Sequence, residues 1–317
     1  MLATSLRTGG ESWRSHLDTA APLLTTLAGV LDAQPAPSNG ANAASWTTLP
    51  VSSAEDGCPL SYESSAALKF VVNVFVWIDA LARVATGSTP IFHGRGHLLR
   101  RPAGMMQLEQ LTGCENWVVS HMVDIGALDE WKKEMQATQR LSLRDLVARA
   151  AAIEGPLTKA AAARLGSTES VAARVGGLDA HRKANRRTCV THLFALAALT
   201  YLHVVVSGFN PALDEVRRTV ADTLAALEAL PDPRLLVHLA WPLTVTGCMA
   251  QPHQEGVFRD LLARADQGSG SGGGDDPALR RCRVAMQVME GVWKRRDSLP
   301  DNWAAAMQLG GTPVLLL

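Results

Sequence analysis

Residues 213–227 read Leu-Asp-Glu-Val-Arg-Arg-Thr-Val-Ala-Asp-Thr-Leu-Ala-Ala-Leu. Apolar residues recur here every three or four positions, and charged residues occupy positions between them. This spacing places the apolar side chains on one face of an α-helix. Asn210-Pro211 just before the segment is a typical helix start, and Leu230-Pro231 just after it is a typical stop. We therefore predict an amphipathic helix between these two prolines.

The next apolar segment, Arg234 to Ala250, contains a proline at position 242. Proline cannot donate to the helical hydrogen-bond ladder, and its ring crowds the carbonyl four residues back. We therefore predict a helix that is kinked or split at Pro242, with Trp241-Pro242 facing inward. Helical spacing returns over 277–296 and predicts a helix that buries five side chains, which are Leu279, Cys282, Met286, Met289 and Trp293.

Helical patterns also extend toward the amino terminus. Residues 192–206 are apolar, but the segment is shorter than the roughly 20 residues of a membrane span, so we expect a buried helix and no membrane partner. Residues 66–86 are too long for a typical strand, and 117–139 continue the helical spacing. No strand pattern emerges. The predicted fold is all-α, a single domain of packed antiparallel helices.

A polar segment rich in Pro, Ser, Asn and Ala spans residues 34–53 and has no periodicity. It predicts a linker after a helix at 13–31, so we divide the chain into an amino-terminal helix plus flexible linker (1–53) and one compact helical unit (54–317). Residues 267–276 contain Gly-Ser-Gly-Ser-Gly-Gly-Gly and predict a flexible surface loop.

The charge balance limits the possible partners. The chain has 30 Lys and Arg against 30 Asp and Glu. Neutralising the phosphates of a nucleic acid requires a basic excess or a dense basic stripe, so we expect no tight DNA binding by this chain. A hydrophobic share of 47% excludes disorder as the general state. The five cysteines are scattered without a zinc-site spacing, which indicates free thiols and no metal or other cofactor in this chain.

The sequence contains little evidence of catalytic or metal-binding motifs. Gly-x-Ser-x-Gly and His-Glu-x-x-His are both missing from the sequence, so we expect no enzyme. His93 and His97 have a metal-ligand spacing, but two glycines between them disfavour the helix that would align both rings. The basic run at 181–187 is either an import patch or phosphate contact, or the solvated start of a helix.

Four large side chains with polar tips lie on segments otherwise built of Leu, Val and Ala. Mostly apolar cavities with a few oriented polar groups are typical of small-molecule sites, so these residues are candidates for a ligand pocket. The alternative is that each is a core residue whose polar tip has a protein partner. The four candidates are Trp77, Tyr201, His203 and Trp241.

Several segments resemble one family when they are taken in order along the chain. They include Leu-Thr-Tyr-Leu-His-Val-Val-Val-Ser-Gly-Phe-Asn-Pro at 199–211 and Leu-Leu-Val-His-Leu-Ala-Trp-Pro-Leu-Thr-Val-Thr-Gly-Cys-Met-Ala at 235–250. Further segments are 13–17, 75–79, 86–90, 113–117 and 285–293. Together they are similar to the carboxy-terminal regulatory domain of fungal zinc-cluster (Zn2Cys6) transcription factors.

The resemblance implies an effector-sensing or autoregulatory domain that controls RNA polymerase II genes in the nucleus. Its implied partners are an apolar small-molecule effector and a second copy of the chain. The clustered cysteines of the zinc module are absent from this chain, so zinc and DNA are expected only through a module that is not part of it. One alternative is a stand-alone relative, located in the cytoplasm and repurposed as a small-molecule binder or enzyme. The other is a helical dimerisation scaffold.

Overall fold

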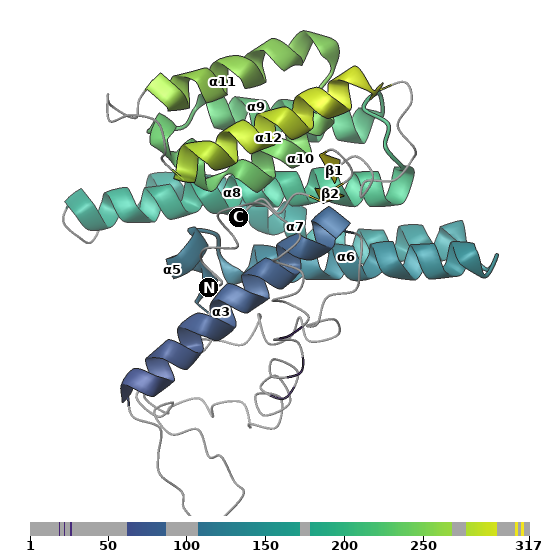
Figure 1. The fold of residues 1–317 in the computed structure, drawn as a ribbon, viewed down its shortest axis with the longest axis horizontal. Coiled ribbons are helices and arrows are strands. Elements are labelled where there is room, and N and C mark those ends of the chain that lie inside the picture. Colours follow the sequence, from purple (N-terminus) through teal and green to yellow (C-terminus); the bar gives the residue numbers. More distant parts are fainter. Residues whose placement is uncertain are drawn as a thin grey trace, which may run out of the picture.

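The computed structural model describes residues 62–86, 107–171, 178–267 and 277–296, the strand residues 308–309 and 312–313, and Thr19, Pro22 and Thr26. Most of these residues are helical, which confirms the all-α class (Figure 1). The α-helices are α3 (Tyr62–Thr86), α5 (Leu108–Thr112), α6 (Asn116–Ala137), α7 (Leu143–Val171), α8 (Leu178–Ser207), α9 (Asp214–Glu228), α10 (Ala240–Cys248), α11 (Glu255–Gln267) and α12 (Pro277–Lys294). The short elements are the 3₁₀ helices η2 (Pro233–His238) and η3 (Pro252–Gln254) and the antiparallel pair β1 (Gln308–Leu309) and β2 (Thr312–Pro313).

Helix α8 is the centre of the fold. It contacts α6 and α7 on one side and α9 and α10 on the other, while α11 and α12 complete the layer above α10 (Figure 1). Helix α3 crosses diagonally and packs against α5 and α6. Residues 184–207 of α8 are long and apolar enough to cross a membrane by composition, but 78% of their most apolar window is buried inside the protein. Such burial is what the core helix of a helical bundle requires.

The amphipathic helix predicted from residues 213–227 is confirmed as α9. Its apolar face is buried, with Val216, Val220 and Leu227 each at most 2% exposed. The helix begins at Asp214, three residues after Pro211, because the Asn210 side chain caps a turn instead: its Oδ1 accepts a hydrogen bond from the Ala212 N–H at 3.0 Å. The predicted end is close, since α9 stops at Glu228.

The segment around Pro242 is split, as the proline predicts. The 3₁₀ helix η2 ends at His238, Leu239 breaks the helical backbone with φ −111° and ψ 20°, and α10 begins at Ala240. Pro242 therefore lies in the first turn of α10, where its missing N–H has no intrahelical partner to lose. A continuous helix would place its ring against the carbonyl of His238, which explains why the break precedes the proline. Trp241 and Pro242 are both buried.

Helix α12 also buries the predicted face. Cys282, Met289 and Trp293 are buried and Met286 is partly buried, while the side chain of Leu279 lies outside the described part. The Trp293 Nε1–H donates to the carbonyl of Gly247 on α10 at 2.7 Å. Gly247 has no side chain to separate the helices, so α12 lies directly on α10.

Several predictions fall outside the described residues. Among them are the linker at 34–53, the glycine-rich segment, His93 and His97. Of the predicted helix at 13–31 only three residues are described, and all three are helical. The division of the chain at residue 53 stays a prediction.

Candidate functional site

A cavity of about 610 Å³ lies between α7, α8 and α9. We call it the α7–α8–α9 cavity. Four residues of α8 line it, at positions 192, 196, 199 and 203. They are spaced by four, three and four residues, so they share one face of the helix. Leu196 and Leu199 are mostly buried and provide an apolar wall, with a histidine at each end of it.

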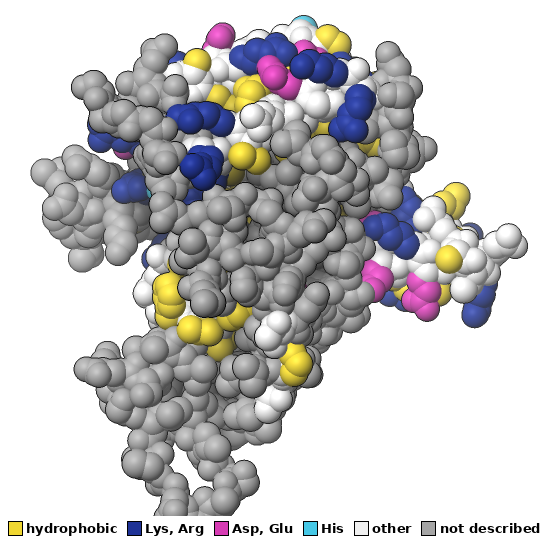
Figure 2. Space-filling model, viewed as in Figure 1, with side chains coloured by type: hydrophobic (Ala, Val, Ile, Leu, Met, Phe, Trp, Pro, Cys, Tyr) yellow, Lys and Arg dark blue, Asp and Glu magenta, His cyan; other side chains and the backbone are white. Residues whose placement is uncertain are grey.

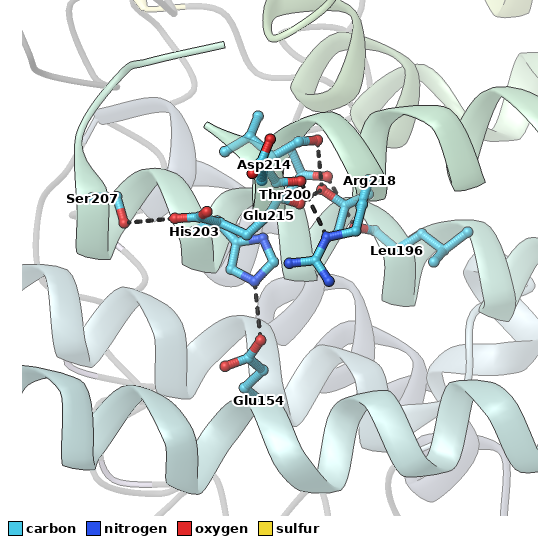
Figure 3. A network of polar contacts seen from close by, with 10 residues as sticks. Glu154, Leu196, Thr200, His203, Ser207, Asp214, Glu215 and Arg218 are labelled. Atoms are coloured by element: carbon cyan, nitrogen blue, oxygen red, sulfur yellow. Dashed lines mark hydrogen bonds and ion pairs between the residues drawn. The ribbon is translucent and has the colours of Figure 1, made fainter. Parts of the chain in front are cut away.

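His203 connects α8 to α7. Its Nε2 lies 3.1 Å from Oε1 of Glu154, and the two side chains face each other across the helices (Figure 3). The His203 side chain is only 12% exposed, whereas Glu154 is 47% exposed. The pair therefore joins a shielded imidazole to a carboxylate at the edge of the cavity.

Helix α9 supplies the opposite wall, which carries charged and small residues. Glu215 accepts a hydrogen bond from the Ser207 hydroxyl at 3.2 Å, and the Arg218 Nε–H donates to the carbonyl of Asp214 at 3.2 Å (Figure 3). Asp222 lines the cavity one turn further along α9. Three carboxylates and one arginine therefore line the cavity together with two histidines and two threonines, so its charged groups are mainly hydrogen-bond acceptors.

The two histidines have unused hydrogen-bonding capacity. Nδ1 of His192 and Nδ1 of His203 are both buried and have no hydrogen-bond partner among the described residues. Buried polar atoms without a partner are rare in folded proteins unless a water molecule or a ligand pairs with them. Burial lowers the pKa of His192, and the nearby Asp222 carboxylate opposes this shift, so the ring is mainly neutral at pH 7.

The structure brings part of the predicted pocket together. Phe194 of α8 lies between two of the candidates: its ring is 5.4 Å from that of Trp77 and 5.5 Å from that of Trp241, with which it stacks at 9°. Tyr201 is 1% exposed, two turns along the same face of α8. These aromatic residues belong to the core cluster.

His203 lies elsewhere because of helix geometry. Each residue of an α-helix advances by about 100°, so positions 201 and 203 differ by about 200° and project from opposite faces of α8. His203 lines the α7–α8–α9 cavity, while Trp77 lines a different cavity beside α5 and α12. The four residues therefore do not surround one common cavity among the described ones, and their ligand-binding role stays a prediction.

Sequence reasoning missed the residues that α7 and α9 contribute, above all Glu154, Glu215 and Arg218. They are remote in sequence from His203, and only packing brings them together. A signal was present on α8 itself, because His192 and His203 are eleven positions apart and share one face with two leucines.

No group of three or more His, Cys, Asp or Glu side chains with the geometry of a metal site occurs within the described ranges. The cysteines described there, at positions 114, 189, 248 and 282, form no disulfide bond.

Comparisons with known proteins cover nearly the whole chain. A family model described as "Fungal specific transcription factor domain" matches residues 2–317. A trichothecene biosynthesis transcription regulator of Trichoderma arundinaceum is 37% identical over 314 residues, which span 96% of this chain and 68% of that protein. A regulator of the same description from Fusarium sporotrichioides is 35% identical with the same shares, and a transcription factor of Pestalotiopsis microspora is 28% identical over 96% of this chain and 50% of that protein. No solved structure matches the chain significantly.

Proposed function

Because this chain belongs to the family of fungal-specific transcription factor domains, we propose that it is a regulatory domain that controls RNA polymerase II genes of fungal secondary metabolism. The observation that carries this proposal is the match of the family model from residue 2 to residue 317, together with relatives that are named as transcription regulators. The trichothecene relatives suggest genes of a biosynthetic cluster as targets, and such a role requires action in the nucleus. Enzymatic activity is not part of the proposal.

A fusion experiment tests the regulatory role. The 317-residue chain is joined to a heterologous DNA-binding domain and expressed in a filamentous fungus with a matching reporter gene. We expect reporter transcription to differ from that of the DNA-binding domain alone, and we expect the unfused chain to leave the reporter unchanged. A fusion that is nuclear and stably expressed but leaves transcription at the level of the DNA-binding domain alone would contradict the proposal.

The α7–α8–α9 cavity is the best-supported effector site. A volume of about 610 Å³ lies within the range of small-molecule sites, which are mostly apolar with a few polar groups. Leu196 and Leu199 supply apolar surface, and the carboxylates of Glu154 and Asp222 accept hydrogen bonds. These features fit an apolar molecule that carries hydroxyl or amine groups, because such groups donate hydrogen bonds to the carboxylates.

Native mass spectrometry of the chain purified from its own host tests the effector site. We expect a retained organic molecule on the wild-type chain and its loss from Ala162→Trp, which fills the cavity from α7. The matched control is Ala148→Trp, at an exposed position of the same helix that does not line the cavity, and it is expected to keep the molecule. A bare wild-type mass, or equal loss from both variants, would oppose an effector in this cavity.

The same spectra test the proposal that the chain forms a homodimer. Leu143 and Val147 of α7 are 70% and 58% exposed and lie one turn apart on one helix face, which is an apolar surface that a second copy could cover. We expect a dimer peak at micromolar concentration. A monomer under gentle conditions would oppose dimer formation.

A further inference from the structure

Two further cavities lie where α5, α8, η2 and α12 meet. One has a volume of about 430 Å³ and is bounded by the end of α5, the first half of α8 and η2. The other, of about 200 Å³, extends toward α3 and α12. They share Leu111, Thr112 and His238, so they adjoin each other, and we call the two together the basic cleft.

Three guanidinium groups converge on the basic cleft. Arg186 and Arg187 line it from α8, and Arg281 lines it from α12. Among the described residues that line it, the acidic one is Glu109. Figure 2 shows Lys and Arg side chains near the left end of α12, and others along the top and right of the same view. The cleft is thus positive although the chain has zero net charge.

No described residue forms an ion pair with Arg186, Arg187 or Arg281. The Nε–H of Arg281 is also buried and has no hydrogen-bond partner in the part of the chain that the structure describes. A buried guanidinium donor without an acceptor is costly, because it has lost water and gained nothing in return. The pKa of His238 reflects the same field, since partial burial and then the charges of Arg186 and Arg281 lower it.

Apolar surface adjoins these cationic groups. Trp77 and Ile78 of α3 and Leu111 of α5 line the smaller cavity together with Arg281. Helix α5 is held in place by side chains of its neighbours: Asn73 Oδ1 accepts from the Gln107 N–H at 2.8 Å, and Asn116 Oδ1 accepts from the Leu108 N–H at 3.0 Å. The apolar wall is therefore fixed relative to the arginines.

We infer that the basic cleft binds a small amphiphilic anion, with its carboxylate or phosphate group at the arginines and its apolar part against Trp77 and Leu111. Guanidinium groups match both oxyanions because their planar N–H donors form paired hydrogen bonds with two oxygens. This site is separate from the α7–α8–α9 cavity, whose polar lining is mainly acidic. The chain therefore carries two recesses of opposite charge preference, one on each side of α8.

Ligand-observed NMR titrations of the full chain test the inference with three probes that share one alkyl group: hexanoate, hexyl phosphate and 1-hexanol. We expect at least one of the anions to bind about ten-fold more tightly than hexanol, because each charged hydrogen bond adds about 1.5–3 kcal/mol. The tighter of the two anions identifies the head group. Equal binding of hexanol and both anions would overturn the inference.

Variants locate the site. Arg186→Gln/Arg187→Gln is expected to weaken anion binding about ten-fold and to leave hexanol binding unchanged. The control Arg144→Gln/Arg264→Gln removes the same charge at exposed positions of α7 and α11 outside the cleft, and it is expected to bind as wild type does. Arg281→Gln provides a second test from α12, with circular dichroism to confirm folding. Equal loss in the control would overturn the assignment.

Two further measurements distinguish anion binding in the basic cleft from ligand binding in the α7–α8–α9 cavity and from binding of a protein partner. Ala162→Trp, which fills the α7–α8–α9 cavity, is expected to leave anion binding unchanged, so failure of the effector site does not decide the fate of the cleft. Binding of an acidic peptide such as octaglutamate, with no binding of hexanoate or hexyl phosphate, would overturn the small-molecule assignment in favour of a protein partner.

Discussion

Replacing Met289 with aspartate is expected to destabilise the chain by about 4 kcal/mol or more, which is a large part of the 5–15 kcal/mol that typically holds a domain together. Met289 is 0% exposed, and it packs at the point where α12 lies on Gly247 of α10. The substitution removes the apolar contacts of the thioether and buries a carboxylate that has no partner there.

Thermal unfolding followed by circular dichroism measures this effect, and we expect the melting temperature to fall by about 6 °C or more. Met289→Leu keeps the volume and is expected to cost less than about 1.5 kcal/mol. Gln287→Asp places the same carboxylate two positions away on the exposed face of α12, where a change within about 0.5 kcal/mol is expected. An unchanged melting temperature for Met289→Asp would mean that this face of α12 is not buried.

The pH dependence of the same variant gives an independent check. Burial raises the pKa of a carboxyl group above its value in the unfolded chain. The folded state of the variant therefore binds a proton more readily than the unfolded state, so its loss of stability relative to wild type should shrink as the pH falls from 7 toward 5. A loss that does not depend on pH would indicate that the introduced carboxylate reaches water.

The spacing of apolar residues predicted the helices well because it shows which side chains can be buried together on one helix face. Val216, Val220 and Leu224 are buried in α9, and Cys282 and Trp293 are buried in α12. In each case a spacing of three and four residues can bury all of the apolar side chains only as a helix.

Helix boundaries were harder to predict because a side chain that can cap a helix can also stabilise a simple turn. An Asn-Pro pair suits the first turn of a helix, but asparagine also accepts a hydrogen bond from the N–H two residues on in a simple turn. Asn210 does the second, and α9 starts at Asp214. Near Pro242 the sequence showed that a helix must break, but the position of the break at Leu239 depends on how η2 packs against α11 and α12.

The candidate site was only partly predictable. Residue type identified His203 as a polar group on an apolar helix, and the structure places it at a cavity. Its partner Glu154 lies 49 positions away, and no spacing in the sequence relates the two residues. Helical geometry alone, however, separates His203 from Tyr201, because residues two positions apart project to opposite sides.

Replacing Phe194 with alanine is the second change with a large expected effect. The Phe194 ring is 1% exposed and lies between Trp77 of α3 and Trp241 of α10, so it connects two helices through the centre of α8. Truncation of a buried phenylalanine typically costs about 3–5 kcal/mol, because it removes buried apolar area and leaves a cavity. The truncation removes two aromatic pairs, and each pair contributes about 0.5–1.5 kcal/mol to this loss of stability.

The helix in which Phe194→Ala loses stability is a second expected result. Helix α3 contacts the rest of the described fold mainly through α5 and α6, and the Trp77–Phe194 pair ties it to the centre. Relative to wild type, the amide hydrogen-exchange rates of Phe194→Ala should therefore increase more in α3 than in α9. Helix α3 loses one of its few contacts with the core, while α9 keeps its packing on α8. Phe194→Leu, which fills much of the space, is expected to restore most of the stability measured by urea unfolding. If Phe194→Ala lost less than about 1 kcal/mol, or if α3 and α9 exchanged equally faster, the aromatic stack would not be the link between α3 and the core.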